Sequence, residues 1–72
     1  MNTQMQILYM QARLVRLAAD EWKKTVNEIN DIFAANDVYS YIEKLWDLFH
    51  IEGDMAVLED IQEYLMSKGV TV

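Results

Sequence analysis

The chain has 72 residues, contains no cysteine or proline, and carries a formal net charge of −6 at pH 7. This length predicts one small domain, residues 1–72, and the lack of cysteine excludes disulfides and cysteine-based metal sites. The negative charge disfavours nucleic acids and anionic membrane surfaces as partners, because both carry charge of the same sign.

The two halves of the chain differ in charge. Residues 1–36 hold four basic and four acidic residues and sum to zero, whereas residues 37–72 hold two basic and eight acidic residues and account for the whole imbalance. Apolar residues make up 53% of the chain, which is more than so small a core is expected to bury. We therefore expect a homodimer or a protein partner, and the acidic half is compatible with a basic partner surface.

No segment predicts a membrane span or a secretion signal. The most apolar stretch, residues 7–19, is interrupted by Gln11, Arg13 and Arg16 and is shorter than the ~20 residues that a bilayer requires. It also lacks the basic start and uninterrupted apolar run of a signal peptide. A cytoplasmic location is the resulting expectation.

The first two predicted helices cover residues 3–20 and 25–35. Apolar residues occupy more than one face of the first helix, which predicts that it is buried on two sides. The second begins with Thr25 and has Glu28 three residues later, the pattern of a capping box in which each side chain binds the other residue's backbone N–H. Its apolar face holds Val26, Ile29, Ile32 and Phe33.

The third predicted helix, residues 38–50, is the element on which the others are expected to pack. Asn36 or Asp37 is expected to cap its start through a short side-chain acceptor. Apolar residues recur along it at the three- and four-residue spacing of one helix face. This stripe consists of Val38, Tyr41, Ile42, Leu45, Leu48 and Phe49.

The fourth predicted helix covers residues 54–68, with Asp54 as its cap, Gly69 as a left-handed stop and residues 70–72 frayed. No window alternates apolar and polar residues between turn signals, so no strand is expected. The predicted fold class is therefore all-α, a compact bundle of four helices. The buried stripe of the last helix is predicted to be Met55, Leu58, Ile61 and Leu65.

The single histidine, His50, is the strongest argument for chemistry. It could act as a general base, or as a metal ligand with Glu52 and Asp54. At a helix end, however, an imidazole also serves to bond the last carbonyl groups. No motif supplies a nucleophile or a second catalytic group, so no enzyme activity, cofactor, metal site or small-molecule substrate is expected.

Residues 25–35, 36–37 and 38–46 have the lengths of a helix-turn-helix. A helix that reads bases needs Arg, Lys, Asn or Gln towards the base edges and basic neighbours on the phosphates. The third helix instead offers Ser40, Glu43, Lys44 and Asp47 in the acidic half. A DNA-binding regulator is therefore an alternative rather than the favoured function.

Tyr39 and Trp46 are seven residues apart, which places them on one face of a continuous helix. Both are residue types that anchor protein interfaces. The predicted partner surface consists of Tyr39, Glu43, Trp46, Asp47 and His50.

Residues 14–68 resemble a family of short bacterial proteins of unknown function. The resemblance rests on Asn27-Glu28-Ile29 to Phe33, on Tyr41-Ile42, Trp46 and Phe49-His50, and on Leu58 to Leu65. One departure is Phe49, where a smaller aliphatic residue is expected before the histidine. Members of this family look, by gene neighbourhood, like companions of ADP-ribosyltransferase-type toxins, which implies an antitoxin or accessory role and transfers no catalytic residues.

The favoured function is a small acidic protein–protein interaction module, an antitoxin or accessory protein to a toxin-type partner. The alternatives are a helix-turn-helix DNA-binding regulator and a structural homo-oligomer with no separate activity. A small hydrolase or metal protein would rest on His50 alone.

Overall fold

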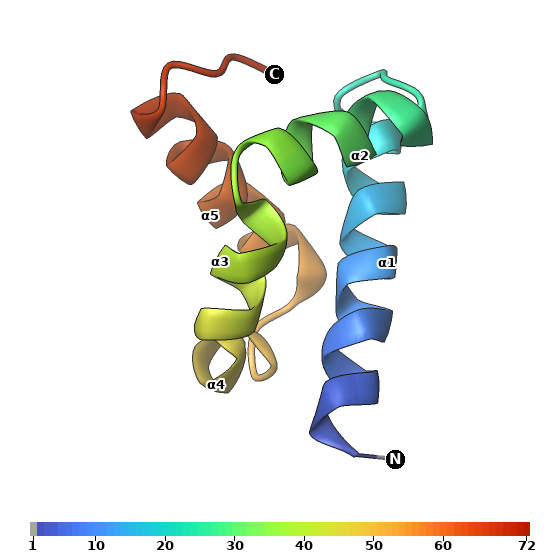
Figure 1. The fold of residues 1–72 in the computed structure, drawn as a ribbon, viewed down its shortest axis with the longest axis vertical. Helices are drawn as coiled ribbons and strands as arrows, with labels where there is room; N and C mark the ends of the chain where they lie inside the picture. The colour runs from blue at the N-terminus through green and yellow to red at the C-terminus, as the bar shows by residue number, and fades with distance from the viewer. Residues whose placement is uncertain (1) are drawn as a thin grey trace.

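A computed structural model describes residues 2–72, so the first residue of the predicted domain lies outside the described residues. Residues 2–72 form five helices and contain no strand, which confirms the all-α fold class. α1 runs along the long axis of the molecule, α2 crosses one end, and the remaining helices lie on the other side (Figure 1). The helices are α1 Thr3–Glu21, α2 Val26–Ala35, α3 Val38–Lys44, α4 Trp46–Phe49 and α5 Asp54–Ser67.

One cluster of buried side chains receives members from all five helices. Its fully buried residues include Leu14 of α1, Phe33 of α2, Ile42 of α3, Phe49 of α4 and Ile61 of α5. Removing these side chains from water is the main favourable term in folding a chain of this size. The molecule is compact, with principal extents of 33 × 22 × 20 Å.

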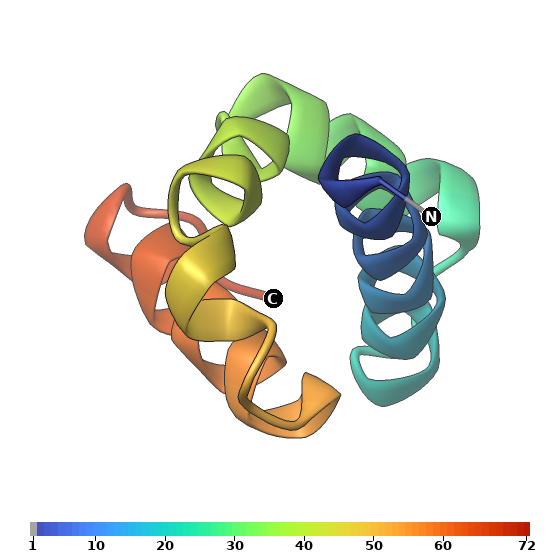
Figure 2. The same cartoon turned by 90° about the horizontal axis from the view of Figure 1, so that it is seen from below.

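The predicted burial of α1 on two sides is wrong. Its buried residues Ile7, Met10, Leu14 and Ala18 follow the spacing of one helix face, whereas Leu8 is 52% exposed. The reason is that α3 and α5, which both contact α1, lie to one side of it, while α2 crosses its end (Figure 2). The outward face of α1 is left uncovered within the described chain.

The start of α2 matches the predicted capping box. The backbone N–H of Glu28 donates to Thr25 Oγ1, and the backbone N–H of Thr25 donates to Glu28 Oε1, both at 3.0 Å. The second of these bonds, together with the Thr25 hydroxyl, lowers the pKa of the Glu28 carboxyl, because both favour the ionised form. Two of the unpaired N–H groups at this helix end are therefore satisfied by side chains.

Gly69 ends α5 in the left-handed conformation, as predicted, with φ of 82°. The N–H of Val70 donates to Leu65 O and the N–H of Gly69 donates to Met66 O, both at 2.9 Å, which forms a Schellman motif. Val70 and Val72 then pack against the core, so the expectation that residues 70–72 fray is wrong.

The predicted side-chain caps at the starts of α3 and α5 do not form. Asp37 occupies the cap position of α3, as predicted, but at φ of 59° it makes no side-chain cap bond, and Asn36 donates its side-chain amide to Ile32 O at the end of α2. Gly53 rather than Asp54 precedes α5, and the Asp54 carboxylate accepts from Arg13 of α1. The Asp54 side chain, predicted to cap its own helix, therefore has a partner on another helix.

The segment predicted as one helix, residues 38–50, is interrupted at Leu45, whose φ and ψ are −100° and 14°. Beyond the break the Phe49 ring is buried in the core and meets Tyr41 edge to face, with ring centroids 5.8 Å apart. Leu48, assigned to the buried stripe, is instead 48% exposed. The predicted stripe of α5 is also wrong at one position. Met55, predicted to be buried, is 45% exposed, and Val57, which was not in the stripe, is buried.

Candidate protein-binding surface

The most exposed large apolar side chain lies in the turn after α4. Ile51 is 74% exposed and Leu48, three residues earlier, is 48% exposed, whereas Phe49 between them is fully buried. Phe49 therefore fixes the orientation of α4, and the helical step from it directs Asp47 and Ile51 away from the core. We call the half-buried Trp46 and its exposed sequence neighbours the α4 surface, defined as Glu43, Trp46, Asp47, Leu48, His50 and Ile51.

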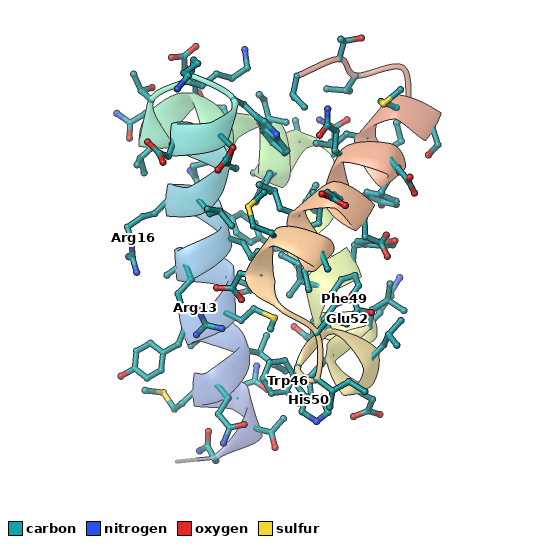
Figure 3. All side chains as sticks on the ribbon, turned by 180° about the vertical axis from the view of Figure 1, so that it is seen from behind. Arg13, Arg16, Trp46, Phe49, His50 and Glu52 are labelled. Atoms are coloured by element: carbon teal, nitrogen blue, oxygen red, sulfur yellow. The ribbon has the colours of Figure 1, made fainter. Side chains whose placement is uncertain are left out.

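Trp46 and His50 form an aromatic platform on one flank of α4. Their rings stack with centroids 5.1 Å apart and planes 23° apart, and Figure 3 shows both side chains at the end of the molecule where α4 lies. His50 Nδ1 lies 2.7 Å from Trp46 O. Because a carbonyl oxygen can only accept, Nδ1 carries the proton in this contact, and Nε2 of the neutral ring remains as an acceptor. This contact confirms that His50 bonds a helix-end carbonyl.

The metal-ligand alternative for His50 gains no support from the geometry. Asp54, one of its proposed co-ligands, is bound to Arg13 at the start of α5. Within residues 2–72, no three His, Asp or Glu side chains lie close enough together to hold a metal ion.

The carboxylates of the α4 surface are not neutralised within residues 2–72. Three other carboxylates of the acidic half do have partners, because Asp54 binds Arg13, Asp37 Oδ2 lies 3.9 Å from Lys68 Nζ, and Asp60 accepts from the Tyr41 hydroxyl at 2.5 Å. Glu43 and Asp47 are exposed, and neither forms an ion pair with any other described residue. The surface thus combines exposed aliphatic groups with unpaired negative charge.

Tyr39 lies apart from the other four residues of the predicted partner surface. Its ring packs edge to face on Phe33 at 5.7 Å, and its hydroxyl donates to Asn30 Oδ1 at 2.7 Å, both in α2. Its carbonyl also accepts from the Gln11 side chain at 3.0 Å, and burial raises the pKa of the Tyr39 hydroxyl. The seven-residue spacing of Tyr39 and Trp46 presumed a continuous helix, which the break at Leu45 removes.

Two members of the α4 surface were missed by the sequence interpretation. Leu48 has the helical spacing of a buried residue but is 48% exposed in the short helix that follows the break at Leu45. Ile51 carried a usable signal, because a large aliphatic residue in a turn before Gly53 belongs to neither helical stripe. Of the remaining four members, Trp46 and His50 are in direct contact, while Glu43 and Asp47 are exposed close to them in sequence.

A second feature is an open groove of about 620 Å³ between α1 and the start of α5. Arg13 crosses it, with Nε 3.0 Å from Asp54 Oδ2 and Nη2 3.4 Å from Oδ1, while Arg16 points outwards from α1 (Figure 3). Its walls also include Leu17, Asp20 and Met55. This lining holds an ion pair and aliphatic side chains and brings together no acid–base pair or nucleophile that could act on a substrate.

Comparison with known proteins gives one match. The family model described as "Protein of unknown function (DUF3791)" matches residues 9–68. No curated protein and no solved structure was found to match the chain. In the described residues, no helix has both the length and the apolar character needed to cross a membrane.

Proposed function

The chain belongs to the DUF3791 family, and we propose that it is a small protein-binding module whose α4 surface takes a basic protein partner. The observation that carries this proposal is the exposure of Leu48 and Ile51 beside the unpaired carboxylates of Glu43 and Asp47. No other function suggested by the sequence has a comparable group of side chains to support it.

The apolar part of the α4 surface supplies the affinity. An aliphatic side chain that is 74% exposed loses a large contact with water when a partner covers it, and the effect is worth about 25 cal/mol per Å² of apolar area. The stacked Trp46 and His50 rings add a rigid flank, because their mutual contact and the partial burial of Trp46 restrict their rotamers before binding.

The charged part of the α4 surface selects the partner. Glu43 and Asp47 lie in the half of the chain that carries the whole net charge of −6. Lys or Arg side chains on a partner would therefore be attracted during approach and paired on contact. A partner with an acidic surface would be repelled.

The resemblance to companions of ADP-ribosyltransferase-type toxins directs the choice of partner. We propose that the α4 surface binds the toxin-type product of a neighbouring bacterial gene, and that the chain acts there as an antitoxin or accessory protein in the cytoplasm. The acidic charge and the apolar contacts of the α4 surface suit this role.

The DNA-binding alternative has less support. α3, the helix that would enter a groove, has only seven residues and ends at Lys44, before the break at Leu45. It presents Ser40, Glu43 and Lys44 rather than a row of basic and amide side chains. The neighbouring unpaired carboxylates would oppose the phosphate backbone.

The test is co-expression with the neighbouring toxin-type gene product, followed by isothermal titration calorimetry on the purified proteins. We expect a one-to-one ratio of the two chains, with the dissociation constant raised at least tenfold, about 1.4 kcal/mol, by either Ile51→Ser or Asp47→Lys. Matched controls on α5 are Met66→Ser, which removes a side chain that is 60% exposed, and Glu63→Lys, and these should change the constant less than about twofold. The proposal is wrong if the wild-type chains form no complex, or if the α5 controls weaken binding as much as the α4 variants do.

A further inference from the structure

The outward side of α1 carries a second apolar stripe, which the α4 surface does not include. Met5, Leu8 and Tyr9 are 41%, 52% and 50% exposed, and they continue at helical spacing into Ala12 and Arg16. We call these five residues the α1 outer face. It lies opposite the buried face of α1 and extends along most of a 19-residue helix.

The charge distribution favours a second copy of the chain as the occupant of this face. Residues 1–36 sum to zero charge, whereas residues 37–72 carry the whole −6. Figure 2 shows α1 on one side of the molecule and α4 and α5 on the other. Two copies that meet through α1 would therefore join their neutral halves and keep their acidic halves apart, which limits the repulsion that self-association of an acidic protein otherwise causes.

The order of residues along the α1 outer face also suits a symmetric pair. If two copies of α1 cross antiparallel with the twofold axis beside Ala12, between residues 12 and 13, residue 9 of one copy lies opposite residue 16 of the other. This places the Tyr9 ring against the Arg16 guanidinium twice, once on each side of the axis. Arg16 forms no hydrogen bond or ion pair with another residue of the described chain, so its charge is available for that contact. Ala12 has a small side chain and allows the two helices to approach closely at the axis.

We propose that the chain forms an antiparallel homodimer through the α1 outer face, with the twofold axis beside Ala12, between residues 12 and 13, and reciprocal Tyr9–Arg16 contacts. A single pair of helices buries less than the ~1,200 Å² of total area found in stable interfaces, so the dimer is a weak one, with a dissociation constant of about micromolar order. The α4 surface stays open in this arrangement, and the homodimer is independent of the proposed partner binding.

The absence of cysteine from the chain makes a direct test available. An Ala12→Cys variant should form a disulfide between two copies under mild oxidation, because the two introduced thiols meet at the axis. The matched control is Ala56→Cys, at an exposed alanine in the first turn of α5. We expect Ala12→Cys to crosslink at least tenfold faster than Ala56→Cys at the same concentration, and equal rates would overturn the proposal.

Light scattering after size-exclusion chromatography gives a second, independent measurement. The wild-type mass should rise from 8.5 kDa towards twice that value as concentration increases. Ala12→Glu, which places two like charges at the axis, should remain at 8.5 kDa at every concentration while its helical circular dichroism is unchanged. Arg16→Glu should raise the dissociation constant at least tenfold, whereas Ile51→Ser should leave it within about twofold. A wild-type chain that stays monomeric, or a dimer broken by Ile51→Ser but not by Ala12→Glu, would overturn the proposal.

Discussion

The α1 outer face and the α4 surface both expose large apolar side chains, but they are built in different ways. The α1 outer face is the uncovered side of one long regular helix in the neutral half of the chain. The α4 surface surrounds a single helical turn in the acidic half, and its orientation depends on the burial of Phe49. In a long regular helix, the helical repeat alone decides which side chains are exposed. In a short turn, the same side chains are exposed only if a buried residue fixes the orientation of the turn.

A helix of four residues is far too short to be stable in isolation, because helix nucleation costs more than one turn of hydrogen bonds returns. α4 therefore exists through its packing on the core. α1 differs, since it places four residues of its buried face in the hydrophobic cluster and would tolerate the loss of any one contact better. Substitutions in the two regions should therefore differ in their effect on stability.

Phe49→Ala should lower the free energy of unfolding by about 3–5 kcal/mol, because it empties a fully buried aromatic site. Urea unfolding followed by circular dichroism would measure the change. Leu48→Ala, in the same turn but 48% exposed, is the matched control and should change stability by no more than about 0.5 kcal/mol. Equal losses in the two variants would contradict the role of Phe49 as the anchor of α4.

Leu14→Ala should lower the free energy of unfolding by about 2–5 kcal/mol, since Leu14 is fully buried at the middle of α1. The same substitution at Leu8, on the α1 outer face, should cost less than about 0.5 kcal/mol in the monomer. Because the residue type and the helix are the same, only burial differs between the two variants. A large loss at Leu8, measured by urea unfolding at low protein concentration, would mean that α1 is covered on both sides.

The Tyr41 hydroxyl should make stability fall at alkaline pH. Burial, and then the hydrogen bond to Asp60, raise the pKa of Tyr41, so the folded state favours the neutral phenol. Its contribution is present below the unfolded tyrosine pKa of about 10 and is lost as pH rises above that value.

Thermal unfolding between pH 9 and pH 11 would measure the fall expected from Tyr41. Tyr41→Phe should reduce the loss of stability at alkaline pH. A smaller loss should remain, because burial also raises the pKa of Tyr39. Tyr9→Phe, at a ring that is 50% exposed, serves as the control and should leave the pH dependence of the wild type. If Tyr41→Phe kept the full wild-type fall, the bond to Asp60 would not hold α3 on α5.

The smallest effect is expected from the Arg13–Asp54 pair, which joins α1 to the start of α5. Its side chains are 47% and 34% exposed, so water and salt screen the attraction. A double-mutant cycle with Arg13→Ala and Asp54→Ala should give a coupling of about 0.2–1 kcal/mol, decreasing as salt is added. A coupling that did not change with salt would indicate a buried pair and a closed groove.

The sequence predicted the elements well where a local rule decided them. The capping box of Thr25 and Glu28 and the left-handed stop at Gly69 were both found, because each depends on residues within one turn of the helix end. The break at Leu45 was not found, since it follows from the position of the Phe49 ring in a core built by distant residues. The predicted cap at Asp54 and the predicted fraying at Val72 were wrong for the same reason, because each residue contacts residues that are far away in the sequence.

The candidate site was predicted only in part, for related reasons. Trp46 and His50, which are close in sequence, stack on one another, while Tyr39 packs on Phe33 of α2 and precedes the break at Leu45. Leu48 could not be recognised as exposed, because its spacing within a continuous helix is that of a buried residue.

The most direct test of the whole account is the light-scattering mass of the complex between this chain and the neighbouring toxin-type gene product, measured at high concentration. If the α4 surface binds the partner and the α1 outer face binds a second copy, the complex contains two copies of each protein. A complex with one copy of each, formed from a chain that is dimeric alone, would contradict the account, because the partner would then displace the second copy from a shared surface.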